Sequence, residues 1–159
     1  MIILGKPNVG KSTILNAILN DEKAIISDIP GTTRDIIEDT ITIGGNIVRF
    51  IDTAGLRNTN DKIEKIGIEK ALKKTNEASI ILYIIDLDKS NLKSIELELE
   101  SKFLKDKNVL VIGNKADLKI KSDVITYFKN KKHLIISGIK ENDIIKLKKL
   151  IENYINLNL

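Results

Sequence analysis

The chain has 159 residues and a net charge of +4, and its 42% hydrophobic and 30% charged residues are typical of one globular domain. It contains no cysteine and one histidine, which excludes disulfides, thiolate nucleophiles, sulfur-ligated metals and histidine clusters. The longest apolar run, 80–85, is far shorter than the ~20 residues of a membrane span, and the N-terminus lacks a secretory-signal pattern, so we expect a cytoplasmic protein.

Short runs rich in isoleucine and valine alternate with segments of helical period, as in an α/β domain with a mostly parallel sheet. We predict strands at 2–4, 38–43, 47–52, 80–86, 109–113 and 134–137. Helices are predicted to begin near Lys11, Ile63, Ser94, Asp123 and Asn142. The last of them should bury one stripe formed by Ile144, Leu147, Ile151 and Tyr154. Two glycines between the second and third strands, Gly44 and Gly45, predict a hairpin turn and an antiparallel pair. The segments 21–37 and 53–62 have no period and are predicted to be loops.

Residues 5–12 have the sequence GKPNVGKS, which fits the pattern G-x-x-x-x-G-K-[ST] between an apolar run and a helical pattern. Such a loop turns backbone N–H groups toward phosphate oxygens, and the following helix adds its positive end. Lys11 then supplies a charge at the β- and γ-phosphates, and the Ser12 hydroxyl can ligate Mg²⁺. The alternative is a glycine-containing turn with an incidental lysine. We predict nucleotide contacts from Asn8, Val9, Gly10, Lys11, Ser12 and Thr13.

The sequence Asn114-Lys115-Ala116-Asp117 follows the fifth predicted strand directly. A carboxylate such as Asp117 can accept the two adjacent donors of guanine, N1–H and the 2-amino group, whereas adenine would leave it unpaired. The alternative is an ordinary turn between a strand and a helix. After the sixth strand, Ser137, Gly138 and Ile139 can offer backbone donors to the guanine O6. The pattern therefore predicts a site for GTP rather than ATP.

Two further segments offer groups for the phosphates and Mg²⁺. Asp52 ends the third predicted strand and is followed by Thr53, Ala54 and Gly55, so the carboxylate can hold Mg²⁺ through a water and the Gly55 N–H can contact a γ-phosphate. In the first long loop, Thr33 can provide a second Mg²⁺ ligand beside Ser12. An Asp-initiated turn and a polar surface turn are the alternatives for these two segments.

These elements, in this order, resemble the translation-factor-related GTPases. The sequences GKPNVGKS, DIPGTTRD, DTAGLR, NKAD and DKIEKIGIEKA are more specifically similar to the G domain of the bacterial tRNA-modification GTPase family MnmE, also called TrmE, over essentially the whole chain. The resemblance implies a three-layer P-loop NTPase G domain, with a six-stranded mostly parallel sheet, one antiparallel edge strand and helices on both faces. It also implies that residues 1–159 form a single GTP-binding domain excised from a larger multidomain protein.

The resemblance implies how GTP would be hydrolysed. Leu56 stands where Ras-like enzymes place a water-orienting glutamine, and it cannot hydrogen-bond a nucleophile. In the MnmE family a glutamate orients the water instead, and Glu64 matches it; the alternative is an acid at a helix N-terminus. Lys11 and Thr33 complete the expected catalytic set. The family also binds K⁺ in place of an arginine finger, and the residues that match its ligands are Asn8, Ser27, Ile29 and Thr32. The last three belong to a loop that is expected to contact the nucleotide through Ser27, Asp28, Ile29, Pro30, Gly31, Thr32 and Thr33.

The family's partners become expectations for this chain. They are GTP and GDP, a second G domain in a transient homodimer formed through the switch loops and, in the full-length protein, the flavoprotein MnmG and tRNA. A G domain of the Der (EngA) ribosome-assembly type is one alternative. A GTP-binding switch module with negligible turnover of its own is another.

Overall fold

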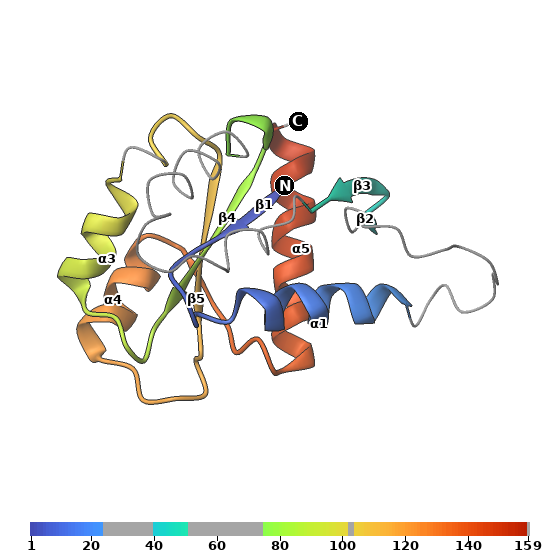
Figure 1. The fold of residues 1–159 in the computed structure, drawn as a ribbon. Coiled ribbons are helices and arrows are strands. Elements are labelled where there is room, and N and C mark those ends of the chain that lie inside the picture. The colour runs from blue at the N-terminus through green and yellow to red at the C-terminus, as the bar shows by residue number, and fades with distance from the viewer. Residues whose placement is uncertain (24–39, 51–74, 102–103, 159) are drawn as a thin grey trace, which may run out of the picture.

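The computed structural model describes residues 1–23, 40–50, 75–101 and 104–158. Four strands in them form one sheet in the order β1-β4-β5-β6, with bounds Ile2–Leu4, Ile81–Asp86, Val109–Asn114 and Leu134–Ile135. All three pairings are parallel, as the isoleucine- and valine-rich runs predict. The carboxyl ends of these strands therefore meet at one edge of the sheet, toward the bottom of Figure 1.

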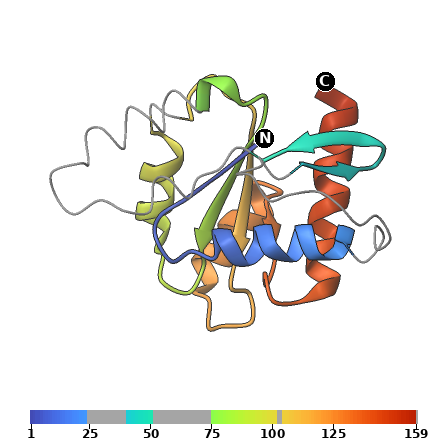
Figure 2. The same ribbon diagram turned by 45° about the vertical axis from the view of Figure 1, so that its right-hand side comes forward.

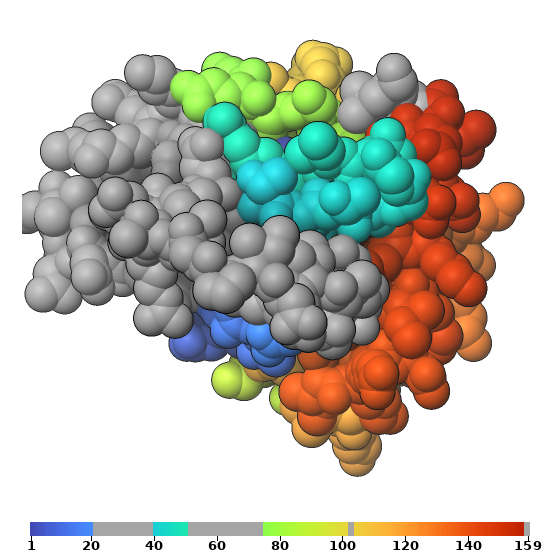
Figure 3. All heavy atoms as spheres, turned by 90° about the vertical axis from the view of Figure 1, so that its right-hand side faces the viewer, coloured from blue at the N-terminus to red at the C-terminus, as the bar shows by residue number. Residues whose placement is uncertain are grey.

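The second and third strands form the predicted antiparallel hairpin. In it, β2 (Thr40–Ile43) pairs with β3 (Asn46–Arg49). The turn residues Gly44 and Gly45 have φ angles of +57° and +80°, a combination that glycine adopts without steric cost. The hairpin packs against helix α5 (Glu141–Asn158), where the Asn46 Nδ2 donates a hydrogen bond to the Asn156 Oδ1 at 3.2 Å. Figure 3 shows the two elements side by side.

The prediction of one six-stranded sheet is not confirmed. The hairpin forms a two-stranded sheet separate from the four parallel strands. Among the described residues, the Met1 amine, directly before β1, donates to the Arg49 carbonyl of β3 at 2.8 Å. Residues 51 and 52, which the sequence assigns to the third strand, lie outside the described residues.

The helices cover both faces of the parallel sheet. Figures 1 and 2 show α1 (Lys11–Lys23) and α5 on one side, and α3 (Leu92–Leu99) and α4 (Ser122–Asn130) on the other. Alternate strand residues supply the two cores, since successive side chains of a strand point to opposite faces. Ile3, Leu82 and Ile84 pack with α1 and α5. Ile85 and Val111 pack with α3 and α4.

The described helices begin within two residues of the predicted positions. α3 begins at Leu92 rather than at Ser94 because Asn91 caps it: the Asn91 side chain accepts from the Ser94 N–H, and Ser94 reciprocates. The stripe predicted for α5 is confirmed for Ile144, Leu147 and Ile151, which are buried, whereas Tyr154 is only partly buried. The helix predicted near Ile63 lies outside the described residues. None of the helices that the structure describes has the length and apolar character of a membrane span.

Candidate functional site

The loop between β1 and α1 sits at the carboxyl edge of the sheet. Gly5, Asn8 and Gly10 have φ angles of +145°, +62° and +98°, so the chain turns sharply before α1 begins at Lys11. A Cβ at Gly5 would lie 2.3 Å from the Ile84 carbonyl oxygen of β4, and glycine is therefore required there. The loop thus lies close against the end of the central strand, with the N-terminal end of a helix directly after it.

The Lys11 ammonium is held against this loop by the loop's own backbone. Its Nζ donates to the Gly5 carbonyl at 2.8 Å and to the Lys6 carbonyl at 2.6 Å. A cation fixed beside a helix N-terminus is a natural binding place for phosphate oxygens. Ser12 and Thr13 follow in the first turn of α1; Ser12 is half-buried and Thr13 is exposed.

Asn114 joins the loop of residues 5–12, the predicted phosphate loop, to the loop after β6. It is the last residue of β5, and its side chain is buried, with 3% exposure. The Nδ2 donates to the Val9 carbonyl at 2.9 Å, while the Oδ1 accepts from the Gly138 N–H at 2.8 Å. Its two polar ends therefore satisfy two backbone groups of loops that lie far apart in the sequence.

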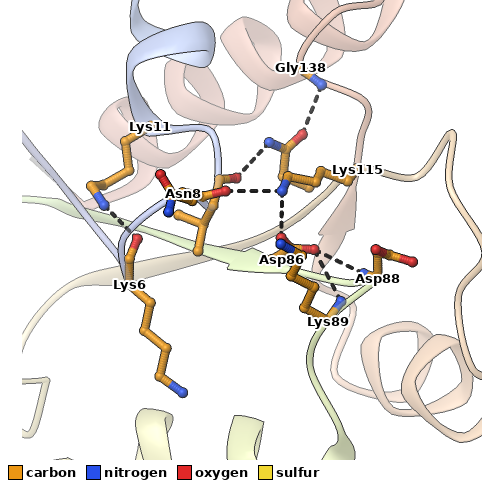
Figure 4. Close-up of polar contacts among 10 residues, drawn as sticks. Lys6, Asn8, Lys11, Asp86, Asp88, Lys89, Lys115 and Gly138 are labelled. Atoms are coloured by element: carbon orange, nitrogen blue, oxygen red, sulfur yellow. Dashed lines mark hydrogen bonds and ion pairs between the residues drawn. The ribbon is translucent and has the colours of Figure 1, made fainter.

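Lys115 makes a second connection to the phosphate loop. Its Nζ donates to the Asn8 carbonyl at 3.0 Å and to the Asp86 carboxylate at 2.5 Å (Figure 4). Asp86 ends β4, is 6% exposed, and also accepts from the N–H groups of Asp88 and Lys89. A buried carboxylate with these three donors is fully compensated, so it holds the Lys115 side chain in one place.

Asp117 lies at the exposed rim of the same edge. Its Oδ1 accepts from the Ser137 hydroxyl at 2.5 Å, and this hydrogen bond lowers the pKa of Asp117 below its ordinary value. The carboxylate is therefore ionised at neutral pH, the state that accepts two guanine donors. Gly138 and Ile139 follow Ser137, and Ile139 is 74% exposed. The predicted base-binding residues of both loops are thus brought together.

The sequence model of the 50S ribosome-binding GTPase family matches residues 1–115. The chain belongs to this family. It is therefore a GTPase domain.

Individual relatives of this GTPase extend the match along the whole chain. The tRNA modification GTPase MnmE of Desulforamulus reducens is 44% identical over 97% of this chain, and that of Cytophaga hutchinsonii is 42% identical over 98%. The chain spans about a third of the length of these relatives, 34% and 33%. A crystal structure of Era in complex with MgGDPNP and part of 16S ribosomal RNA has a TM-score of 0.66 and 32% identity; it covers 96% of this chain and 55% of the Era chain.

The site predicted for this GTPase is described only in part. Its phosphate loop and base-binding loops are brought together as expected. The remaining predicted residues lie outside the described residues; they are Ser27, Asp28, Ile29, Pro30, Gly31, Thr32, Thr33, Asp52, Thr53, Ala54, Gly55 and Glu64.

Sequence reasoning missed Asp86. The signal was present, since an acidic residue closes the apolar run 80–86 and so falls at the carboxyl end of a strand. The same argument singled out Asp52 after the third predicted strand. Asp86, unlike Asp52, is not part of a ligand-binding motif in the sequence. Its carboxylate pairs with Lys115.

Proposed function

We propose that this chain is the GTPase domain of a tRNA-modification protein, and that it hydrolyses GTP to GDP and phosphate in a K⁺-dependent manner. The observation that carries the proposal is the 44% identity to a tRNA modification GTPase over 97% of the chain. The geometry agrees with it, since an ionised Asp117 and a Lys11 held at the phosphate loop lie on one edge of the sheet.

The described part of the site fits the two cations that the proposal needs. Mg²⁺ and K⁺ are hard ions that prefer oxygen ligands. Ser12 offers a hydroxyl in the first turn of α1, and Asn8 offers an exposed amide from a residue with positive φ. We propose that Mg²⁺ is held by Ser12, Thr33 and, through a water, Asp52, and that K⁺ is held by Asn8, Ser27, Ile29 and Thr32. The ions would neutralise charge that develops on the phosphates during hydrolysis.

We further propose that two copies pair through their switch loops during hydrolysis, and that residues 1–159 act within a longer protein that works with MnmG on tRNA. The partial coverage of the relatives, about a third of their length, supports the second point. Glu64 would orient the attacking water, with Lys11 and Thr33 at the phosphates.

The GTPase rate in KCl against NaCl tests the K⁺ dependence. We expect a rate at least about tenfold higher in KCl, since one well-placed charge in an active site is worth about that or more. Asn8→Ala should remove the stimulation, whereas the matched change Asn16→Ala, on the exposed face of α1, should leave it. Equal, near-zero rates in both salts would contradict the mechanism and favour a switch module without turnover of its own.

Glu64→Ala tests the water-orienting residue. Loss of a group that positions the nucleophile should reduce kcat about 100-fold or more and leave GTP affinity nearly unchanged. A large loss of GTP affinity with an unchanged kcat would instead assign Glu64 a structural role.

A second candidate function is ribosome assembly of the Der (EngA) type. The family description, 50S ribosome-binding GTPase, and the similarity to an Era structure that contains ribosomal RNA favour it. Co-sedimentation with ribosomal subunits in the presence of a non-hydrolysable GTP analogue distinguishes the candidates. GTP-dependent binding to a subunit would support this second function over tRNA modification.

A further inference from the structure

Lys6 belongs to the phosphate loop, but its side chain leaves the nucleotide site. Figure 4 shows it extending away from Lys11, Asn8 and Lys115. Its ammonium forms an ion pair with Glu98 of α3, on the other side of the parallel sheet from α1. The charge of Lys6 is therefore directed to α3, and not to a phosphate.

Glu98 is an unusual acid for a surface helix. Its side chain is only 12% exposed, and its Oε1, which faces Lys6, is shielded from solvent. Its Oε2 accepts from the Tyr83 hydroxyl at 3.2 Å. Burial raises the pKa of Tyr83, and the neighbouring Glu98 adds to the effect, so the hydroxyl stays protonated and donates. A carboxylate removed from water in this way depends on a cation for its stability.

The three residues connect strand β4, helix α3 and the phosphate loop. Tyr83 lies in the middle of β4, opposite Leu4 of β1 and Val111 of β5, so its hydroxyl is a fixed point above the sheet. The Tyr83 hydroxyl therefore positions the Glu98 carboxylate from the side of the sheet. The same carboxylate pairs with Lys6, which lies two residues after Leu4, the last residue of β1. The first residues of the phosphate loop are therefore held by this carboxylate as well as by the Lys11 ammonium, which donates to the Gly5 and Lys6 carbonyls.

The backbone of Lys6 links this ion pair to Lys11. The Lys6 carbonyl accepts from the Lys11 ammonium at 2.6 Å, so the residue that is tethered to α3 also holds the phosphate-binding lysine. We infer that Glu98 is a positioning residue for the phosphate loop: the Lys6–Glu98 ion pair fixes the first turn of the loop, and through it the place of Lys11, so that α3 is coupled to nucleotide affinity. The inference rests on nucleotide binding by this GTPase domain alone; it requires neither K⁺ nor pairing of two copies.

The dissociation constant of a fluorescent GDP analogue tests the coupling. Glu98→Gln and Lys6→Met should each weaken binding about fivefold, which corresponds to ~1 kcal/mol. The double variant should bind no more weakly than either single variant, because both remove the same ion pair. Lys6→Arg keeps the cation and should bind like the wild type. Glu96→Gln, which removes the same charge from an exposed position of α3, is the matched control and should bind within twofold of the wild type.

Several outcomes would overturn the inference. One is Glu98→Gln binding GDP within twofold of the wild type; another is a double variant whose loss equals the product of the two single losses. If Glu98→Gln does not fold, Lys6 decides the question, because its side chain is 59% exposed and tolerates substitution. Equal affinities for Lys6→Met and Lys6→Arg would then contradict a role for the charge. A weaker Lys6→Met with a wild-type Lys6→Arg would support it.

Discussion

The Asn114 side chain offers the most direct test of how the site is assembled. Asn114→Ala removes both of its hydrogen bonds, and leaves the Val9 carbonyl and the Gly138 N–H without these partners. Each buried group left unsatisfied costs about 1–3 kcal/mol. Water that enters the vacated space can hydrogen-bond to these two groups and offset part of this cost. We therefore expect the free energy of unfolding to fall by about 2–4 kcal/mol, mainly because the Val9 carbonyl and the Gly138 N–H lose their partner.

Urea unfolding of the nucleotide-free protein measures this loss by linear extrapolation. The matched control is Asn153→Ala on the exposed face of α5, where the change should stay within about 0.7 kcal/mol, the range of helix propensities. The variant should also bind GDP more weakly, because the phosphate and base loops lose their common support. A loss of stability no larger than that of the control would refute the reasoning.

Three further predictions concern single residues of the site. Gly5→Ala should destabilise the protein by about 2–4 kcal/mol in urea unfolding, because the new Cβ would lie 2.3 Å from the Ile84 oxygen at a φ of +145°; unchanged stability would show that the loop can shift. The Ser137 N–H donates to Asp143 at 2.9 Å and lowers the pKa of that carboxyl, so its stabilisation is present above the unfolded pKa of about 4 and is lost as pH falls through the lower folded value. Asp143→Asn should therefore lose less stability than the wild type between about pH 6 and about pH 3, and equal losses in urea midpoint would contradict this. Asp117→Asn should exchange guanosine for xanthosine diphosphate in competition binding, because an amide offers a donor where the carboxylate only accepts; retained guanine preference would overturn the base assignment.

The parallel sheet and the placement of the site could be predicted because both depend on local patterns. Apolar runs without alternation indicated strands buried on both faces, and polar residues at their carboxyl ends had to meet at one edge. The guanine-binding pattern identified Asn114 and Asp117 at the end of one strand, and Ser137 was placed at the end of another. The hydrogen bond between Asp117 and Ser137 then follows from the adjacency of β5 and β6 in the sheet.

Strand association could not be predicted in the same way. The glycine pair Gly44 and Gly45 specifies its own hairpin, because the turn requires positive φ at two successive residues. Which other strand the hairpin joins depends on long-range packing. The buried residues Ile41, Ile43 and Val48 place the hairpin against the core shared with α5. Strand β3, residues 46–49, does not pair with β1.

The residues that the sequence did not reveal, Asp86 and Glu98, share a physical feature. Both are acids that pair with lysines of the nucleotide loops, and the side chains of both, 8% exposed in Asp86 and 12% in Glu98, are largely removed from water. In the sequence Glu98 is indistinguishable from Glu96 and Glu100, which the same helical period exposes to solvent. A motif records the groups that meet the nucleotide, since ligand chemistry fixes their identity and spacing. The groups that hold the motif in place are set by the packing of this particular chain, so they become visible only when the strand and the helix that carry them are placed beside the loop.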